Sequence, residues 1–124
     1  MAKTILVADD EDAPRRAVVM VLKMAGYVVV EAVDGVDALA KAIEHRPAAL
    51  VLDMMMPNKH GHEVCAALRQ RDDELKTVPV ITLTGLDAML GEELASEAGS
   101  QKYLNKPVNP RELLDTLKEL LGEG

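Results

Sequence analysis

Short runs of β-branched and aliphatic residues alternate five times along this chain with longer segments whose apolar residues recur at helical spacing. This alternation is typical of α/β domains with a parallel sheet, because each parallel strand needs a long crossover to the next. The first, third and fourth runs are apolar almost throughout, which indicates strands covered by helices on both faces. Strands are predicted over residues 4–8, 28–32, 48–52, 79–84 and 101–105.

The segments between these runs have recognisable helix ends. The first predicted helix closes at Gly26, because glycine readily adopts the positive φ that ends many helices. Asp34 is expected to cap the second helix, which runs to about His45. The third and fourth helices are predicted over 61–71 and 88–98. Asn109 opens the fifth, whose apolar stripe consists of Leu113, Leu114, Leu117, Leu120 and Leu121.

Length, cysteine content and charge restrict the class of protein. Residues 1–124 are expected to form a single domain, because a chain of this length can bury an apolar core without disulfides. Cys65 has no partner within the chain, and the first apolar run is too short for a signal peptide or a membrane span. We therefore expect a cytoplasmic protein with no membrane association. The net charge of −7 and the lack of Trp and Phe disfavour direct nucleic-acid binding and favour cations and basic partner surfaces.

Chemically active residues follow four of the predicted strands. Asp9 and Asp10 follow the first strand, Asp53 the third, Thr84 ends the fourth, and Lys106 follows the fifth. Right-handed crossovers bring the carboxyl ends of parallel strands to one edge of the sheet, so these residues are predicted neighbours. Three carboxylates in a partly desolvated cleft repel one another unless they share a cation, and oxygen ligands suit Mg²⁺ or Mn²⁺. A carboxylate can also accept a phosphoryl group, whose charge a metal, an ammonium and a hydroxyl can neutralise together.

Four segments of the sequence resemble, in order, the motifs of receiver domains of two-component response regulators. They are ILVADDED, LVLDMMMPNKHG, PVITLTG and YLNKP, and the resemblance extends from Ile5 to about Leu121. It implies the receiver fold, a doubly wound α/β domain of five βα units with five parallel strands in the order 2-1-3-4-5, as in chemotaxis receivers.

The resemblance also implies a role for each site residue. Asp53 corresponds to the phosphoacceptor. Asp10 would bind Mg²⁺ directly, Asp9 directly or through water, and Met55 through its backbone carbonyl. The residues that would contact or respond to the phosphoryl group are Thr84 and Lys106, which would each bond a phosphoryl oxygen, and Tyr103, the switch aromatic. The peptide bond between Lys106 and Pro107 is expected to be cis.

The function implied by the resemblance is a signalling switch and not a multi-turnover metabolic enzyme. The domain would catalyse its own phosphorylation from the phosphohistidine of a histidine kinase or histidine phosphotransferase. Phosphorylation would then alter the surface of the fourth helix, fifth strand and fifth helix, which would bind a protein effector as a monomer or a phosphorylation-dependent dimer. Met55 and Leu86 occupy the two positions that modulate autodephosphorylation in the family, and both are apolar here. We therefore expect a long-lived phosphoaspartate.

Two other functional classes share parts of this pattern. Phosphatases of the haloacid-dehalogenase type also form an aspartyl phosphate, but they need an acid two residues after the nucleophile, where this chain has Met55. Flavodoxin-like cofactor carriers share the fold, but the loop after their first strand is rich in Gly, Ser and Thr, whereas here it is acidic. Both classes are disfavoured.

Several residues also have ordinary structural interpretations. His60 and His62 are interpreted as part of a surface loop, because a zinc site needs further nitrogen or sulfur ligands. Arg15 and Arg16, like the run 69–73, are interpreted as solvated helix faces, although the arginine pair lies where a phosphotransfer partner could dock. The three consecutive methionines, Met54, Met55 and Met56, are interpreted as core and cleft packing in a chain without Phe.

Overall fold

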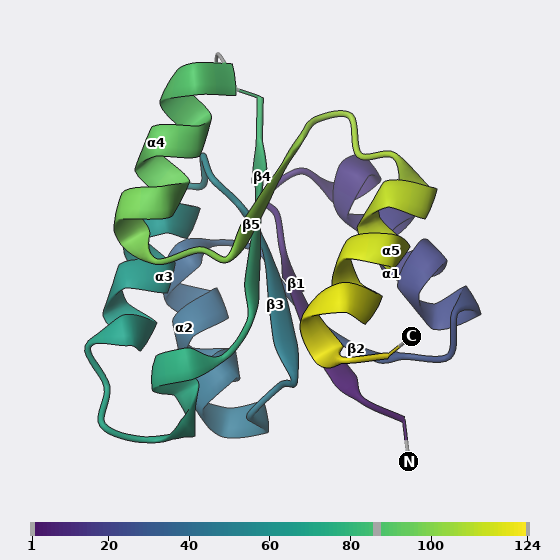
Figure 1. Ribbon diagram of the computed structural model, residues 1–124, viewed down its shortest axis with the longest axis horizontal. Coiled ribbons are helices and arrows are strands. Elements are labelled where there is room, and N and C mark those ends of the chain that lie inside the picture. The colour runs from purple at the N-terminus through teal and green to yellow at the C-terminus, as the bar shows by residue number, and fades with distance from the viewer. Residues whose placement is uncertain (1, 86–87, 124) are drawn as a thin grey trace.

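The computed structural model describes residues 2–85 and 88–123, without the side chains of residues 88 and 89. Strands and helices alternate along the chain (Figure 1). The strands are β1 (Thr4–Ala8), β2 (Val28–Ala32), β3 (Ala49–Asp53), β4 (Val80–Thr84) and β5 (Lys102–Asn105). The helices are α1 (Asp12–Met24), α2 (Gly35–His45), α3 (Gly61–Arg69), α4 (Ala88–Ala98) and α5 (Pro110–Leu121), with a short 3₁₀ helix η1 (Glu74–Thr77).

All five strands are parallel and form one sheet in the order β2-β1-β3-β4-β5. Figure 1 shows α2, α3 and α4 on one face of the sheet and α1 and α5 on the other. The architecture and strand order expected from the resemblance are confirmed. Predicted and observed strand boundaries agree to within one residue.

Alternate residues of the central strands supply two separate cores. On β1, Leu6 packs among the side chains of α2 and α3, whereas Ile5 packs among those of α1 and α5. On β3, Leu50 and Val51 divide between the two cores in the same way. Because neighbouring residues of a strand point to opposite faces, a strand buried on both sides must be apolar at every position, as these sequences are.

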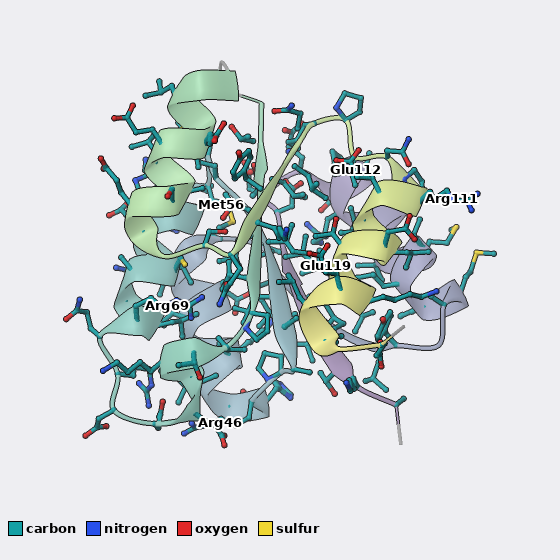
Figure 2. All side chains as sticks on the ribbon, in the orientation of Figure 1. Arg46, Met56, Arg69, Arg111, Glu112 and Glu119 are labelled. Carbon is teal, nitrogen blue, oxygen red and sulfur yellow. The ribbon has the colours of Figure 1, made fainter. Side chains whose placement is uncertain are left out.

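Methionine takes part in the core of this protein, which has no Phe. Met54 and Met56 are fully or almost fully buried, whereas the side chain of Met55 between them is half exposed. Met56, labelled in Figure 2, belongs to the core on the α2 and α3 side. The thiol of Cys65 is buried in the same core, where burial raises its pKa.

The predicted helix caps are present. The Asp34 side chain accepts a hydrogen bond of 2.7 Å from the backbone N–H of Asp37, and the Asn109 side chain accepts one of 3.1 Å from Glu112. Gly26 lies just after α1 with a φ of 97°. These contacts satisfy N–H groups that have no partner inside the helix, so they fix where each helix begins.

The polar run 69–73 was interpreted as a solvated helix face, but most of it lies beyond the end of α3. The helix ends at Arg69, and η1 follows, with the Asp73 side chain accepting a hydrogen bond of 3.1 Å from Leu75 N–H. Arg69, labelled in Figure 2, donates to the backbone carbonyls of Gly99 (3.0 Å) and Lys76 (3.2 Å). Arg69 therefore connects α3 to the segments after α4 and within η1.

In the described part of the chain, no helix has the length and apolar character needed to cross a membrane.

Candidate functional site

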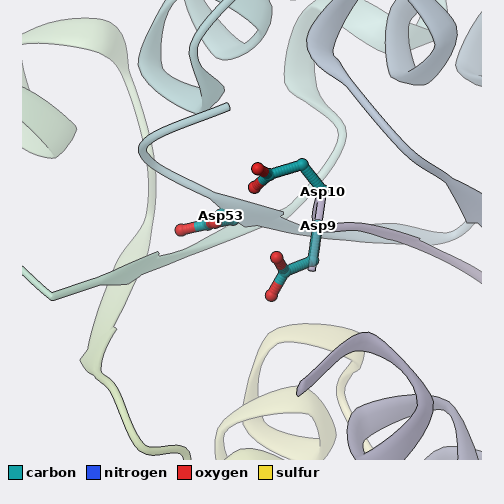
Figure 3. Close-up of side chains that lie close together, drawn as sticks. All are labelled: Asp9, Asp10 and Asp53. Carbon is teal, nitrogen blue, oxygen red and sulfur yellow. The ribbon is translucent and has the colours of Figure 1, made fainter. Parts of the chain in front are cut away.

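Three carboxylates meet at the carboxyl edge of the sheet, as the strand-end pattern predicted. Asp9 and Asp10 follow β1, and Asp53 is the last residue of the neighbouring strand β3. One carboxylate oxygen from each lies within 4.8 Å of the other two (Figure 3). Asp9 is 1% exposed and Asp53 4% exposed, while Asp10 faces solvent. Oxygens this close, from two buried acids and one accessible acid, fit a divalent cation that keeps several waters.

Lys106 lies between the two buried carboxylates. Its Nζ atom is 3.2 Å from Oδ2 of Asp9 and 3.3 Å from Oδ2 of Asp53. Burial acts to lower the pKa of Lys106, but the charges of Asp53 and Asp9 outweigh it and raise the pKa. Lys106 therefore stays protonated and offsets part of the repulsion between the acids. The peptide bond to Pro107 is cis, as expected.

Burial raises the pKa of Asp53 to about 6. Repulsion from Asp9 adds to this effect, while Lys106 and a hydrogen bond from the Met55 backbone oppose it. The high pKa shows that the environment of Asp53 favours neutralisation of its charge. A cation or a covalent bond to the carboxylate would have the same effect as a proton.

Thr84 and Tyr103 lie on the neighbouring strands β4 and β5, and Tyr103 pairs with Thr82, two residues before Thr84. Thr84 is the last residue of β4, is 1% exposed, and lies against Gly91 of α4. Tyr103 on the edge strand β5 is 38% exposed. A hydrogen bond with Glu92 of α4 raises the pKa of Tyr103. The fourth helix is thus in contact with both residues expected to form the switch, a contribution that the sequence pattern did not reveal.

The prediction for Arg15 is wrong. Arg15 is 7% exposed, and its guanidinium faces the end of β1 instead of solvent. Arg16, by contrast, is exposed. The sequence signal that could have revealed the burial is spacing, since Arg15 lies three, four and seven residues before the buried Val18, Val19 and Leu22.

A match to a known protein family shows which family the chain belongs to. A family model described as the response regulator receiver domain matches residues 5–118. This chain belongs to the response regulator receiver domain family. A receiver domain is a signalling switch and not a metabolic enzyme, in agreement with the class expected from the sequence. The acidic cluster of Asp9, Asp10 and Asp53 is typical of a receiver phosphoacceptor site.

Relatives of this receiver domain include both longer regulators and single domains. It is 42% identical over 121 residues to the response regulator MprA of Mycobacterium ulcerans, an alignment that covers 98% of this chain and 51% of that protein. The chain therefore spans about half the length of the curated relatives it matches. The chemotaxis protein CheY4 of Vibrio cholerae is 34% identical, with a TM-score of 0.90 and coverage of 98% of this chain and 100% of that one.

A second solved structure bears on the cation. The receiver domain of a sensor histidine kinase from Pseudomonas aeruginosa, solved with a magnesium ion coordinated in its active-site cleft, is 27% identical to this chain. Its TM-score is 0.90, with coverage of 98% of this chain and 99% of that one. The oxygen ligands of this receiver domain fit the same kind of ion.

His60 and His62 lie at the start of α3. His60 lies at the end of the loop before α3, as interpreted, whereas His62 lies in the first turn of α3, the helix predicted over 61–71. Their stacked rings have centroids 5.7 Å apart. The Glu63 side chain accepts a hydrogen bond of 3.0 Å from the His60 N–H and so stabilises the predicted start of α3. Leu86, the second position expected to affect dephosphorylation, lies outside the described residues.

Proposed function

We propose that this receiver domain accepts a phosphoryl group on Asp53 from the phosphohistidine of a histidine kinase or histidine phosphotransferase. The observation that carries the proposal is the position of the Asp53 carboxylate, which lies close to those of Asp9 and Asp10 and is 3.3 Å from the Lys106 ammonium. A carboxylate placed between a cation site and a fixed ammonium can attack phosphorus while both neutralise the charge that develops on the phosphoryl oxygens.

Each residue of the site has a distinct task in this proposal. An oxygen of Asp53 forms a bond to phosphorus as the P–N bond of the phosphohistidine breaks, and the imidazole leaves. Lys106 pairs with one phosphoryl oxygen, and Thr84 donates its hydroxyl to another. Asp9, Asp10, Asp53 and the backbone carbonyl of Met55 would hold Mg²⁺, or Mn²⁺ in its place, which supplies further charge neutralisation.

The output of the switch is proposed to be the surface formed by α4, β5 and α5. The resting contacts are Thr84 against Gly91 and Tyr103 with Glu92, so both residues are in contact with α4 before phosphorylation. Movement of Thr84 toward the phosphoryl group would release space at α4 that Tyr103 could enter. A bond made at Asp53 would thereby change the surface presented to an effector protein, either by the monomer or by a phosphorylation-dependent dimer.

The phosphodonor is proposed to dock beside α1. An apolar cavity of about 560 Å³ lies between α1 and the start of α5, and its lining includes Asp9, Lys106, Pro14, Ala17 and Val108. Because this cavity adjoins the acidic site, an apolar side chain seated in it would hold a donor protein next to Asp53. A histidine kinase or histidine phosphotransferase is the donor proposed to dock there.

A small phosphodonor with a P–N bond tests the reaction. With phosphoramidate and Mg²⁺, we expect the parent protein to gain one phosphoryl group and the Asp53→Asn variant to gain none. Asp115→Asn, which replaces an exposed acid on α5, is the matched control and should be labelled like the parent. EDTA should abolish the labelling. Full labelling of Asp53→Asn would refute the proposal.

A further inference from the structure

Arg15 is a buried cation in a position that helix α1 otherwise reserves for apolar residues. Its side chain is 9% exposed, and it shares the inner face of the helix with Val18, Val19 and Leu22. An arginine is almost never buried to this degree unless its N–H groups are paired. Its partners therefore explain why it is there.

The guanidinium of Arg15 donates to three acceptors from three different segments. Its Nη1 donates to the backbone carbonyl of Asp9 (3.0 Å), at the end of β1. Its Nη2 donates to Oδ1 of Asp12 (2.8 Å), the first residue of α1, and its Nε donates to Oε1 of Glu31 (3.0 Å) on β2. The rigid fork of arginine can bind all three at once, which the single ammonium of lysine cannot do in the same geometry.

Two of these contacts bracket the turn that carries the acidic cluster. Asp9 and Asp12 are the two ends of the turn 9–12, and Asp10 lies between them. The remaining groups of Asp9 are fixed as well, because its N–H donates to the Ala32 carbonyl (3.2 Å) and its Oδ1 accepts from the Glu11 N–H (3.0 Å). Arg15 thus supplies the contact that fixes the Asp9 carbonyl and joins it to the start of α1.

We infer that Arg15 is a positioning residue for the cation site: it fixes the turn so that Asp9 and Asp10 face Asp53 before a cation binds. Arg15 acts through the backbone of Asp9 and through Asp12, and not by coordination. The inference rests on the proposed function in so far as it needs a divalent cation at the cluster. Groups that orient metal ligands in this way typically change metal affinity by about 10- to 100-fold when they are removed.

The inference can be separated from a simple charge effect because the two predict opposite changes in Mg²⁺ affinity when Arg15 is removed. Arg15 is a positive charge near the cluster, so its removal should by itself tighten the binding of Mg²⁺. If Arg15 positions the turn, its removal should loosen the ligands and weaken binding. A merely structural role would lower thermal stability and leave the cation affinity of the folded protein unchanged.

The test is a calorimetric titration of Mg²⁺ into the parent and into Arg15→Met, Arg15→Lys and Glu31→Gln, well below the unfolding temperature of each protein. We expect Arg15→Met to raise the Kd for Mg²⁺ about 10-fold or more, and Arg15→Lys, which keeps the charge but loses the fork, to raise it by a smaller factor. Among the described residues, Glu31 is the partner of Arg15 that lies outside the turn, and Glu31→Gln removes its charge while leaving an oxygen that can accept from Nε. It is the matched control and should keep the Kd within about twofold of the parent.

The outcomes distinguish the inference from the proposed function. If the parent binds Mg²⁺ and folded Arg15→Met binds it equally well or more tightly, the inference is overturned and the proposed function stands. If the parent itself binds no Mg²⁺, the proposed function fails and the inference fails with it. Should Arg15→Met not fold, Arg15→Lys decides, because an unchanged Kd in that variant would contradict the need for the forked contact.

Discussion

Thr84 lies so close to Gly91 of α4 that a Cβ atom built at Gly91 would be 2.6 Å from Oγ1 and 2.9 Å from Cγ2 of Thr84. Glycine inside a helix is less favourable than alanine by about 0.5–1 kcal/mol, so Gly91 lowers the stability of α4. The lack of a side chain at Gly91 leaves room for the Thr84 side chain at the end of β4. The contact explains how α4, a helix of the proposed output surface, could respond to the position of Thr84.

Substitution of Gly91 tests this contact. Gly91→Ala should lower the free energy of unfolding by about 1–3 kcal/mol, because the overpacking against Thr84 outweighs the better helix propensity of alanine. Ser96→Ala, at an exposed position of the same helix, is the matched control and should be neutral or slightly stabilising. Urea denaturation measures both. Equal stabilisation of the protein by the two substitutions would contradict the observed contact.

The raised pKa of Asp53 predicts a pH-dependent stability in metal-free protein. Between about pH 4 and the folded-state pKa of about 6, the native protein binds more protons than the unfolded chain, so the free energy of unfolding falls as the pH rises through this window. In EDTA near neutral pH, Asp53→Asn should therefore be more stable than the parent by on the order of 1–3 kcal/mol. This advantage should shrink toward about pH 4.

Denaturant titrations across this pH range, with the parent and the variant in parallel, provide the measurement. Asp115→Asn, at an exposed position, should show no comparable pH-dependent gain. Added Mg²⁺ should stabilise the parent and narrow its difference from Asp53→Asn, because the ion neutralises the same repulsion. A stability difference of constant size over the whole pH range would be inconsistent with a raised pKa.

Removal of the Lys106 ammonium should raise the pKa of Asp53 further. Lys106 opposes the effects of burial and of Asp9 on that carboxyl group, so in Lys106→Met the hydrogen bond from the Met55 backbone is left as the opposing effect. A carboxyl-detected NMR titration of metal-free protein follows this directly. Lys102→Met is the control, because Lys102 on β5 pairs with Glu119 and not with the acidic cluster. An unchanged or lower pKa of Asp53 in Lys106→Met would show that the 3.3 Å ion pair is not formed in solution.

The phosphoaspartate formed at Asp53 is expected to be lost slowly. The half-exposed side chain of Met55 has no group that can orient a water for attack on phosphorus, and Leu86 is likewise apolar. The double variant Met55→Asn, Leu86→Lys should lose its phosphoryl group faster than the parent in Mg²⁺. The decay of the phosphorylated species over time gives both rates. Faster loss from the parent than from the variant would reverse this prediction.

Much of the site could be predicted because each of its residues stands at the end of a strand. The carboxyl ends of parallel strands share one edge, so the sequence positions of Asp53 and Lys106 were enough to bring them together. The same reasoning predicted the caps at Asp34 and Asn109, where a short polar side chain precedes a helical pattern.

The features that were missed depend on partners far away in the sequence. Arg15 was interpreted as a surface residue because arginine is usually exposed, and its partner Glu31 lies on β2, 16 residues further along the chain. Gly91 gives no local sign of its contact, since only the packing of α4 on β4 brings it to Thr84.

The most direct test of the account is the location of the phosphoryl group. The protein is incubated with acetyl phosphate and Mg²⁺, reduced with borohydride, which converts an aspartyl phosphate to homoserine, digested and analysed by mass spectrometry. We expect homoserine at position 53 and at no other aspartate. Conversion of Asp9 or Asp10 in place of Asp53, or no conversion in protein that binds Mg²⁺, would contradict it.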